Sequence, residues 1–434
     1  MQTINKTVTP QIAEVKNKIG GSKFKKILKI LGPGLITGAS DDDPSGIATY
    51  SQAGAQFGLA TLWTALITFP LMASIQEICA RIGIVTETGL TTTLKRHYPK
   101  AILYIMILFS FPAIVLNIGA DIEGMGAVSN LLLPTVPSFA FSIMFTILLS
   151  FVIIKFRYQQ LAKILKWLCF ALLLYFIVPF LTKTDWIDVM KHTFLPSIHF
   201  NKEFIQILVA ILGTTISPYL FFWQATMEAE DMEHDPKKLV ANRRILKNMK
   251  LDVNFGMLFS NLVMFFIILT AGTALFPNGI RNIDTVEQAA AALRPLAGNV
   301  AYLLFAVGII GTGLLAIPVL AGSVSYMVSE TFGWTMGLDK KFKEAKGFYI
   351  VMVISLIIGL FMNFIGITAI QALVYTAILY GITAPILIAI ILHVANKKSI
   401  MGKYKNGKWS NILGFLTLIL MSVAAVALLY FQFK

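Results

Sequence analysis

Apolar stretches long enough to cross a bilayer recur along the whole chain. A hydrocarbon core of about 30 Å needs roughly 20 apolar residues in a helix, and eleven such stretches follow one another with short polar connections. This pattern predicts an all-α integral membrane protein of about 11 transmembrane helices and leaves no soluble domain of useful size. The predicted spans are residues 33–57, 60–85, 101–130, 137–155, 159–182, 203–229, 252–276, 298–328, 347–364, 368–393 and 410–432.

The composition agrees with this pattern. Of the 434 residues, 56% are hydrophobic and 13% are charged, and the mean hydropathy is +0.75. Soluble domains usually carry charge on about a quarter of their residues. The sequence contains no nucleotide-binding, dinucleotide-binding or zinc-hydrolase motif, so it favours neither an ATP-driven pump nor an enzyme, and no cofactor is expected.

The distribution of basic residues predicts the membrane topology. A net charge of +14 would suggest a nucleic-acid partner in a soluble protein. If residues 1–31 form a cytoplasmic N-terminal segment, however, 30 of the 36 Lys and Arg residues fall on the cytoplasmic side. Such an excess is the positive-inside signal. We therefore expect a multi-pass protein of the plasma (inner) membrane, with the N-terminus in the cytoplasm and the C-terminus outside. Its macromolecular environment is then the lipid bilayer and not nucleic acid.

Two spans are interrupted near their middle by proline beside small or polar residues. The first span contains Asp43-Pro44-Ser45-Gly46, and the sixth contains the segment 213–218, which ends at Pro218. Proline cannot donate a backbone hydrogen bond and disfavours helix in the residue before it. Both segments therefore predict unwound backbone, which must face protein or a water-filled cavity because lipid cannot satisfy it.

The spacing of the two breaks predicts an inverted repeat. They lie five helices apart, and because five is odd, a second unit beginning at the sixth helix enters the membrane from the opposite side. Interrupted helices in inverted halves are typical of LeuT-like, five-plus-five transporters, whose substrate binds between the breaks. We expect a first repeat at 32–183 (spans 1–5), a second at 184–393 (spans 6–10), and a cytoplasmic loop with an additional span 11 at 394–434.

Three consecutive aspartates precede Pro44. A charged residue at the centre of a membrane helix costs roughly 2.5–3.5 kcal/mol and is a functional candidate by default. Asp43 is expected at the unwound segment, whereas Asp41 and Asp42 are expected to line the access path or to hold water around the ion. No Lys or Arg occurs in the middle of any predicted span. The countercharge must then come from a metal cation or a proton.

At these residues the sequence resembles the NRAMP family of divalent metal transporters, and the resemblance covers essentially the whole chain. The first helix shares Gly-Pro-Gly at 32–34, the Asp-Pro core at 43–46 and Gln-Ala-Gly-Ala at 52–55, and the segment 213–218 resembles the sixth helix. The resemblance implies a divalent metal that is transported as substrate. The residues that it places around the metal are Asp43, Gly46, Thr214 and Ser217.

Several departures from the family pattern concern the metal ligands. The family motif Asp-Pro-Gly-Asn, whose Asp and Asn ligate the metal, has Gly46 in place of Asn, and Met-Pro-His of the sixth helix is replaced by 217–219, Ser-Pro-Tyr. Thr214 stands where a small alanine contributes its carbonyl. A thioether favours soft ions such as Mn²⁺, Fe²⁺ and Cd²⁺, whereas Mg²⁺ prefers oxygen and keeps several waters. The pattern resembles the NRAMP-related magnesium transporters, a branch that conducts Mg²⁺ as well as Mn²⁺.

The residues that carry protons in the family are also changed. Proton-coupled members use the sixth-helix His, an Asp and a Glu three residues apart on helix 3, and arginines on helix 9. Here Tyr219 replaces the His and is neutral near pH 7, Asp121 is followed three residues later by Gly124, and span 347–364 contains no Arg. We therefore expect uniport driven by the membrane potential, which supplies roughly 4.6 kcal/mol per 100 mV to a divalent ion.

The leading hypothesis is an importer of largely hydrated Mg²⁺, with Mn²⁺ as a second substrate, that functions as a monomer. Tyr375 and Thr376 of span 10 are additional candidates near the ion, because a polar side chain of this span approaches the metal in the family. Three rivals stay open. One is a proton-coupled Mn²⁺/Fe²⁺ importer of the ordinary type. Another is an organic-solute symporter on the same scaffold, although such sites usually bind a carboxylate, which the three aspartates would repel. The third is a membrane-embedded sensor or structural protein, which a flux measurement would distinguish.

Overall fold

The computed structural model describes residues 33–156, 174–181, 184–234, 241–294, 298, 301–364 and 366–433. Every regular element in these ranges is a helix. Eight predicted spans appear as helices that are long and apolar enough to cross a membrane. Their elements are α4 (Trp63–Thr86), α6 (Lys100–Leu132), α7 (Ser138–Lys155), α11 with α12 (Lys202–Thr215 and Pro218–His234), α13 (Arg243–Ala274), α16 (Ala301–Phe332), α18 (Ala369–Asn396) and α20 (Lys408–Phe433).

The other three predicted spans have identifiable counterparts. The first span is divided into α2 (Pro33–Asp41) and α3 (Pro44–Phe57), and the ninth is α17 (Lys346–Leu360), continued by the 3-10 helix η5 (Phe361–Phe364). Most of span 159–182 lies outside the described residues, except for α9 (Leu174–Leu181). The N-terminal segment 1–31 also lies outside them. The predicted polytopic, all-helical architecture is confirmed for the part of the chain that the structure describes.

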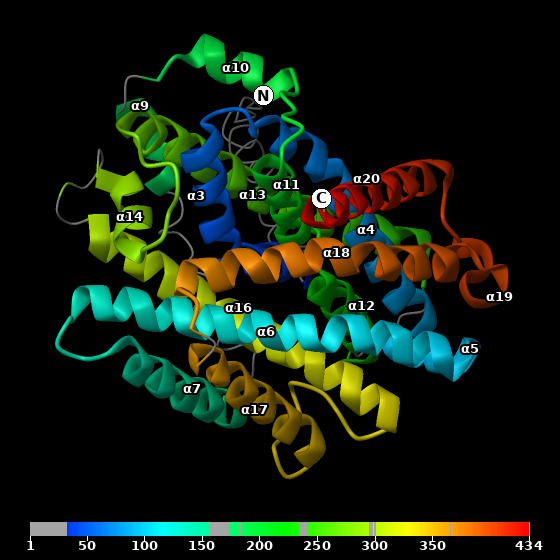
Figure 1. Cartoon of the computed structure of the whole chain (residues 1–434). Helices are drawn as coiled ribbons and strands as arrows, with labels where there is room; N and C mark the ends of the chain where they lie inside the picture. Colours follow the sequence, from blue (N-terminus) through cyan, green and yellow to red (C-terminus); the bar gives the residue numbers. More distant parts are fainter. Residues whose placement is uncertain are drawn as a thin grey trace, which may run out of the picture.

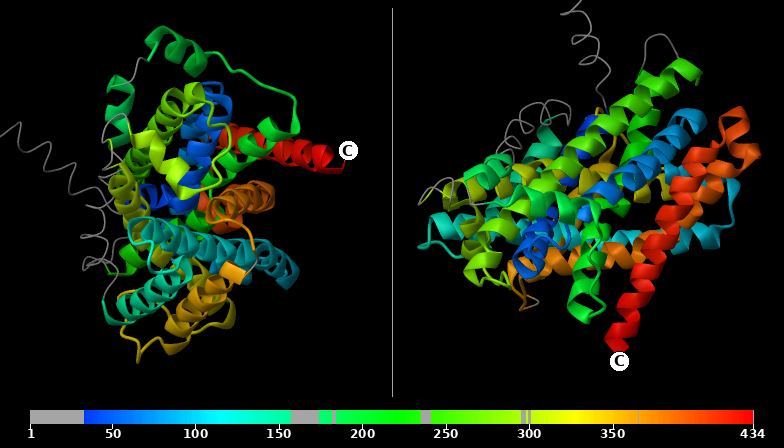
Figure 2. Two further views of the ribbon diagram at one scale, coloured as in Figure 1. Left: turned by 60° about the vertical axis from the view of Figure 1, so that its left-hand side comes forward. Right: turned by 90° about the horizontal axis from the view of Figure 1, so that it is seen from above.

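Short helices connect the long ones at both ends of the bundle: α5 (Leu90–His97), α10 (Trp186–Phe194), η2 (Phe276–Asn278), α14 (Val286–Ala290), η3 (Ala291–Leu293), α19 (Lys398–Met401) and η6 (Gly402–Tyr404). Among the long helices, α6 lies against both α16 and α18 (Figure 1). Helix α20 packs on α18 at the edge of the bundle, and its C-terminal end extends away from the other helices (Figure 2).

The two broken helices lie in the centre of the bundle because small residues allow close backbone packing. Helices α2 and α3 pack on α13, α11 packs on α18, and α12 packs on α4. A Cβ atom at Gly38 would lie 2.2 Å from the carbonyl oxygen of Gly256, and one at Gly213 would lie 2.0 Å from that of Ala377. Small residues at helix interfaces are the usual means of close packing in membranes. They hold both breaks in the protein interior, away from lipid.

Candidate metal-binding site

The first break is shorter than predicted and begins earlier. Helix α2 ends at Asp41 and α3 begins at Pro44, so that only Asp42 and Asp43 are non-helical. The prediction that the break spans 43–46 is therefore wrong for Ser45 and Gly46, which belong to the first turn of α3. Proline is favoured at the first helical position, where no backbone donor is needed. Asp43 caps this helix: its Oδ1 accepts a hydrogen bond from Gly46 N at 2.8 Å.

The second break has the same form. Helix α11 ends at Thr215, Ile216 and Ser217 are non-helical, and α12 begins at Pro218. The predicted break over 213–218 is correct at its end, but residues 213–215 are still helical. Two non-helical residues followed by a proline at the helix start thus recur in both broken helices.

Each proline leaves one carbonyl without its helical donor, and a side chain supplies the missing bond. Pro44 cannot donate to Ser40, four residues earlier, and the Tyr219 hydroxyl donates to that carbonyl at 2.7 Å. Pro218 likewise cannot donate to Thr214, whose carbonyl accepts from Ser217 Oγ at 2.5 Å. Buried backbone acceptors need such partners. Tyr219 therefore joins α12 directly to α2, and the Ser217 oxygen retains lone pairs for a cation.

Replacing Tyr219 with Phe should destabilise the protein, because the buried Ser40 carbonyl would lose its donor. We expect a loss of about 1–3 kcal/mol in the free energy of unfolding. The measurement is the midpoint of thermal unfolding in detergent. Tyr104→Phe is the matched control, since Tyr104 is 57% exposed on α6. Equal midpoints for the two variants would show that the bond to Ser40 contributes nothing.

Asp43 is buried, with 2% of its surface exposed, and has a second partner that the sequence analysis missed. The Nδ2 group of Asn117, on α6, donates to Asp43 Oδ2 at 2.9 Å. Asn117 is itself fully buried, and its Oδ1 has no hydrogen-bond partner among the described residues. Asn117 lies four residues before Asp121, so both face the same side of α6. An amide oxygen that lacks a hydrogen-bond partner and lies beside a buried carboxylate is a suitable ligand for a cation.

Replacing Asn117 with Ala should weaken metal binding, because it removes both the donor to Asp43 and the adjacent amide oxygen. We expect the KM for metal uptake to rise about five- to twentyfold, which corresponds to roughly 1–2 kcal/mol. Asn130→Ala is the control on the same helix, since Asn130 donates to the backbone of Val136. The interpretation fails if both variants have the wild-type KM.

The other aspartates are also buried and incompletely bonded. Ser260 on α13 donates to Asp41 Oδ2 at 2.6 Å, and it lies 3.3 Å from Asp42 Oδ1. The remaining oxygens of Asp41 and Asp42, and both oxygens of Asp121, have no hydrogen-bond partner among the described residues. Asp121 lies close enough to Asp43 for the two carboxylate charges to repel each other. None of the four carboxylates forms an ion pair with a described Lys, Arg or His.

The remaining predicted ligands, Gly46, Thr214 and Ser217, lie in or next to the two breaks. A Cβ atom at Gly46 would lie 3.4 Å from Thr214 Oγ1, so the first turn of α3 faces the end of α11. Thr214 and Ser217 are both buried. In the described ranges no group of three or more His, Cys, Asp or Glu side chains is arranged to hold a metal. Beside Asp43 lie the Asn117 amide and the carboxylates of the other three buried aspartates.

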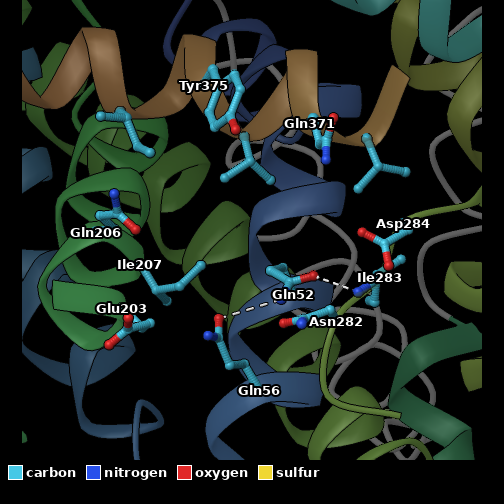
Figure 3. Close-up of a pocket in the computed structure, with 13 residues that line it drawn as sticks. Gln52, Gln56, Glu203, Gln206, Ile207, Asn282, Ile283, Asp284, Gln371 and Tyr375 are labelled. Carbon is cyan, nitrogen blue, oxygen red and sulfur yellow. Dashed lines mark hydrogen bonds between the residues drawn. The ribbon is translucent and has the colours of Figure 1, made fainter. Parts of the chain in front are cut away.

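The two candidates from span 10 face different places. Thr376 Oγ1 lies 3.5 Å from Ser45 Oγ, and Ser45 donates to the Leu373 carbonyl at 2.9 Å. Tyr375 is 53% exposed and lines a separate pocket with Gln52 and Gln371 (Figure 3). Neighbouring residues on a helix point about 100° apart. The structure therefore brings Thr376, and not Tyr375, to the first turn of α3.

Comparison with known proteins places the chain in one family. Residues 34–431 match the sequence profile of the family described as "Natural resistance-associated macrophage protein-like". The chain is 25% identical over 427 residues to the "Divalent metal cation transporter MntH" of Caldanaerobacter subterraneus subsp. tengcongensis, with 96% of this chain and 97% of that protein covered. The MntH of Bacillus subtilis is 24% identical over 442 residues, covering 99% of this chain and 100% of the relative.

Solved structures share the fold. The Eremococcus coleocola manganese transporter, in complex with an aromatic bis-isothiourea substituted compound, has a TM-score of 0.72 at 17% identity, covering 94% of this chain and 87% of that one. MhsT in complex with L-phenylalanine has a TM-score of 0.60 at 12% identity, covering 92% and 97%. These likenesses confirm the predicted LeuT-like transporter fold.

Proposed function

Because the chain belongs to the Nramp family of divalent metal transporters, we propose that it imports Mg²⁺, with Mn²⁺ as a second substrate. It is a multi-pass membrane transporter and not an enzyme, and the metal is its substrate. In our proposal the ion binds at Asp43 while it keeps most of its water. Gly46, Thr214 and Ser217 border the ion at the two breaks or in the helical turns next to them, and Asn117 adds an amide oxygen from α6.

The observation that carries this proposal is the oxygen chemistry around Asp43. Asn117, Thr214 and Ser217 offer amide, carbonyl and hydroxyl oxygens, which suit hard ions such as Mg²⁺. The side chain that stands where the family has a thioether is Ser217. The other three buried aspartates add further carboxylate oxygen and no sulfur, so the donor set remains one that suits a hard, hydrated ion.

A sulfur atom close to the second break faces another interface. Met264, on α13, accepts hydrogen bonds through its Sδ from Thr215 Oγ1 at 3.6 Å and Thr68 Oγ1 at 3.9 Å. This sulfur therefore lies between α4, α11 and α13. We do not assign it as a ligand, so the proposed donor set contains oxygen only.

We propose that transport is uncoupled from protons. The Tyr219 hydroxyl, at the position where the family has its His, donates its hydrogen bond to the Ser40 carbonyl. Helix α17 contains no Arg. The proposed topology, with a cytoplasmic N-terminus in the plasma membrane, lets an inside-negative potential draw the cation inward. The repeat boundaries at 183 and 393, and function as a monomer, belong to the same proposal.

The test is Mg²⁺ uptake into proteoliposomes under a potential set by a K⁺ gradient and valinomycin, with both lumen and medium at one pH. We expect an inside-negative potential to raise the initial rate, because the ion carries two charges. Inside-out and right-side-out insertion can be separated by protease treatment. The absence of Mg²⁺ uptake in vesicles that do take up Mn²⁺ would overturn the proposal.

A proton-coupled Mn²⁺ importer is the second candidate. Its support comes from the relatives named as manganese or divalent metal cation transporters and from the neighbouring buried carboxylates of Asp43 and Asp121. Such a protein would acidify the vesicle lumen as Mn²⁺ enters.

A further inference from the structure

A polar pocket lies at the C-terminal end of α3, which is the end farther from the metal site. It has a volume of about 220 Å³ and is bordered by α3, α11, α18 and the loop that precedes α14 (Figure 3). Glu203 and Asp284 are exposed at its edge. In the proposed topology this end of the bundle faces outside. The pocket is therefore placed where an incoming ion would first meet the protein.

One face of α3 carries a row of polar side chains from the pocket toward the metal site. Ser45, Thr49, Gln52 and Gln56 follow one another at intervals of four, three and four residues, which places them in one row along the helix. Ser45 lies in the first turn, beside the break, and Gln52 and Gln56 line the pocket. At 1.5 Å per residue, Gln52 lies about 13 Å along the axis from Asp43. Thr49 Oγ1 is buried without a described hydrogen-bond partner.

The pocket wall combines fixed amides with two carboxylates. Gln52 Oε1 accepts from Ile283 N at 2.8 Å, while its Nε2 donates to the Arg281 carbonyl at 3.3 Å. Gln56, Gln206 and Gln371 also line the pocket. Glu203 and Asp284 lie on opposite sides of Gln52 (Figure 3). The Arg281 guanidinium, which would oppose a cation, lies 3.4 Å above the centre of the Phe276 ring.

The size of the pocket fits an ion that keeps its first hydration shell. A water molecule needs roughly 10–15 Å³ of such a cavity, so six waters need about 60–90 Å³, and the pocket has about 220 Å³. Amide groups can both donate to and accept from such waters, while carboxylates attract the charge through them. This wall would not strip the ion, since Mg²⁺ in particular releases water reluctantly.

We propose that this pocket is a docking site for a fully hydrated divalent cation, held through its waters by the amides and by Glu203 and Asp284. The ion would then move along the polar row of α3 to Asp43. The inference rests on the proposed function only in that a divalent cation is transported, and it does not depend on whether Mg²⁺ or Mn²⁺ is preferred.

The first experiment uses hexaamminecobalt(III), which has the size of a hexahydrated divalent ion and does not exchange its ligands. Added outside right-side-out vesicles, it should compete with Mn²⁺ uptake by occupying the pocket without being transported. The absence of inhibition from this side, or inhibition only from the lumen, would overturn the proposal. This measurement uses the wild-type protein and is independent of how any variant folds.

The second experiment removes the two charges with Glu203→Gln and Asp284→Asn together. We expect about a fivefold higher KM for Mn²⁺ and about a tenfold weaker block by hexaamminecobalt(III) at low ionic strength, with an unchanged maximal rate. Both effects should shrink in high salt, which screens exposed charges. Glu287→Gln, exposed on α14 outside the pocket, should resemble wild type. An equal block of the double variant and wild type would overturn the docking site.

The two proposals fail in different ways. Vesicles that transport Mn²⁺ but no Mg²⁺, and that are blocked as predicted, would refute the magnesium assignment and leave the docking site intact. Vesicles that transport Mg²⁺ but show no difference between the double variant and Glu287→Gln would refute the docking site alone.

Discussion

Replacing Asp43 with Asn is expected to reduce kcat/KM for metal uptake by about 100-fold or more. Asn has nearly the same shape and can still accept the hydrogen bond from Gly46, but it lacks the charge, and its amide nitrogen cannot accept the hydrogen bond that Asn117 donates to Asp43. At an effective dielectric constant of about 20, a unit charge some 4 Å from a divalent ion contributes about 8 kcal/mol before desolvation is subtracted. One third of this energy already corresponds to about 100-fold.

Initial uptake rates in proteoliposomes, over a range of metal concentrations, test this expectation. Asp188→Asn is the control, because Asp188 lies on α10 and pairs with His192 far from the breaks in sequence. The thermal unfolding midpoint of each variant shows whether the protein is folded. If Asp43→Asn transports metal like the control, the charge at the first break is not part of the site.

Replacing Ser217 with Met should change which metal is preferred. A thioether at this position would supply a soft ligand and favour Cd²⁺ and Mn²⁺ over Mg²⁺. The substitution also leaves the Thr214 carbonyl without the hydroxyl that now donates to it at 2.5 Å. A second variant, Ser217→Ala, loses the same bond without gaining sulfur, so it separates the two effects.

We expect Ser217→Ala to raise the KM for all three metals by a similar factor. Ser217→Met should raise the preference for Cd²⁺ over Mg²⁺ by about tenfold relative to Ser217→Ala, or roughly 1.4 kcal/mol. The measurement is inhibition of Mn²⁺ uptake by Cd²⁺ and by Mg²⁺ in each variant. An unchanged ratio between the Met and Ala variants would mean that residue 217 does not face the ion.

The breaks could be predicted from local chemistry, but their positions could not be placed to the residue. Pro44 and Pro218 prevent a continuous helix whatever surrounds them. Whether proline lies inside the unwound segment or begins the next helix depends on the preceding cap. Asp43 caps α3 through Gly46 N, and this bond includes Ser45 and Gly46 in the helix.

The partners of the breaks were harder to predict because they come from distant parts of the chain. Tyr219 was expected to matter as a replacement for a proton carrier, whereas it satisfies the carbonyl that Pro44 leaves open. This role follows from a contact between residues 179 positions apart. Asn117 did have a signal in the sequence, since a polar residue four positions before Asp121 extends the polar face of the third span.

In span 10, helical periodicity alone separates the two candidates. Adjacent residues cannot face one site equally, and Tyr375 and Thr376 are adjacent. Gln371 and Tyr375, four residues apart, share the pocket face, while Thr376 approaches Ser45. The choice between these faces required knowing which side of α18 meets α3.

The most direct test of the account is Mn²⁺ uptake into proteoliposomes with a pH indicator in the lumen and increasing Mg²⁺ outside. We predict that Mg²⁺ inhibits Mn²⁺ uptake competitively and that the lumen pH does not follow the metal, because an oxygen-lined site accepts both ions and Tyr219 is bonded to the Ser40 carbonyl. Acidification of the lumen together with Mn²⁺ uptake that Mg²⁺ does not inhibit would contradict the account.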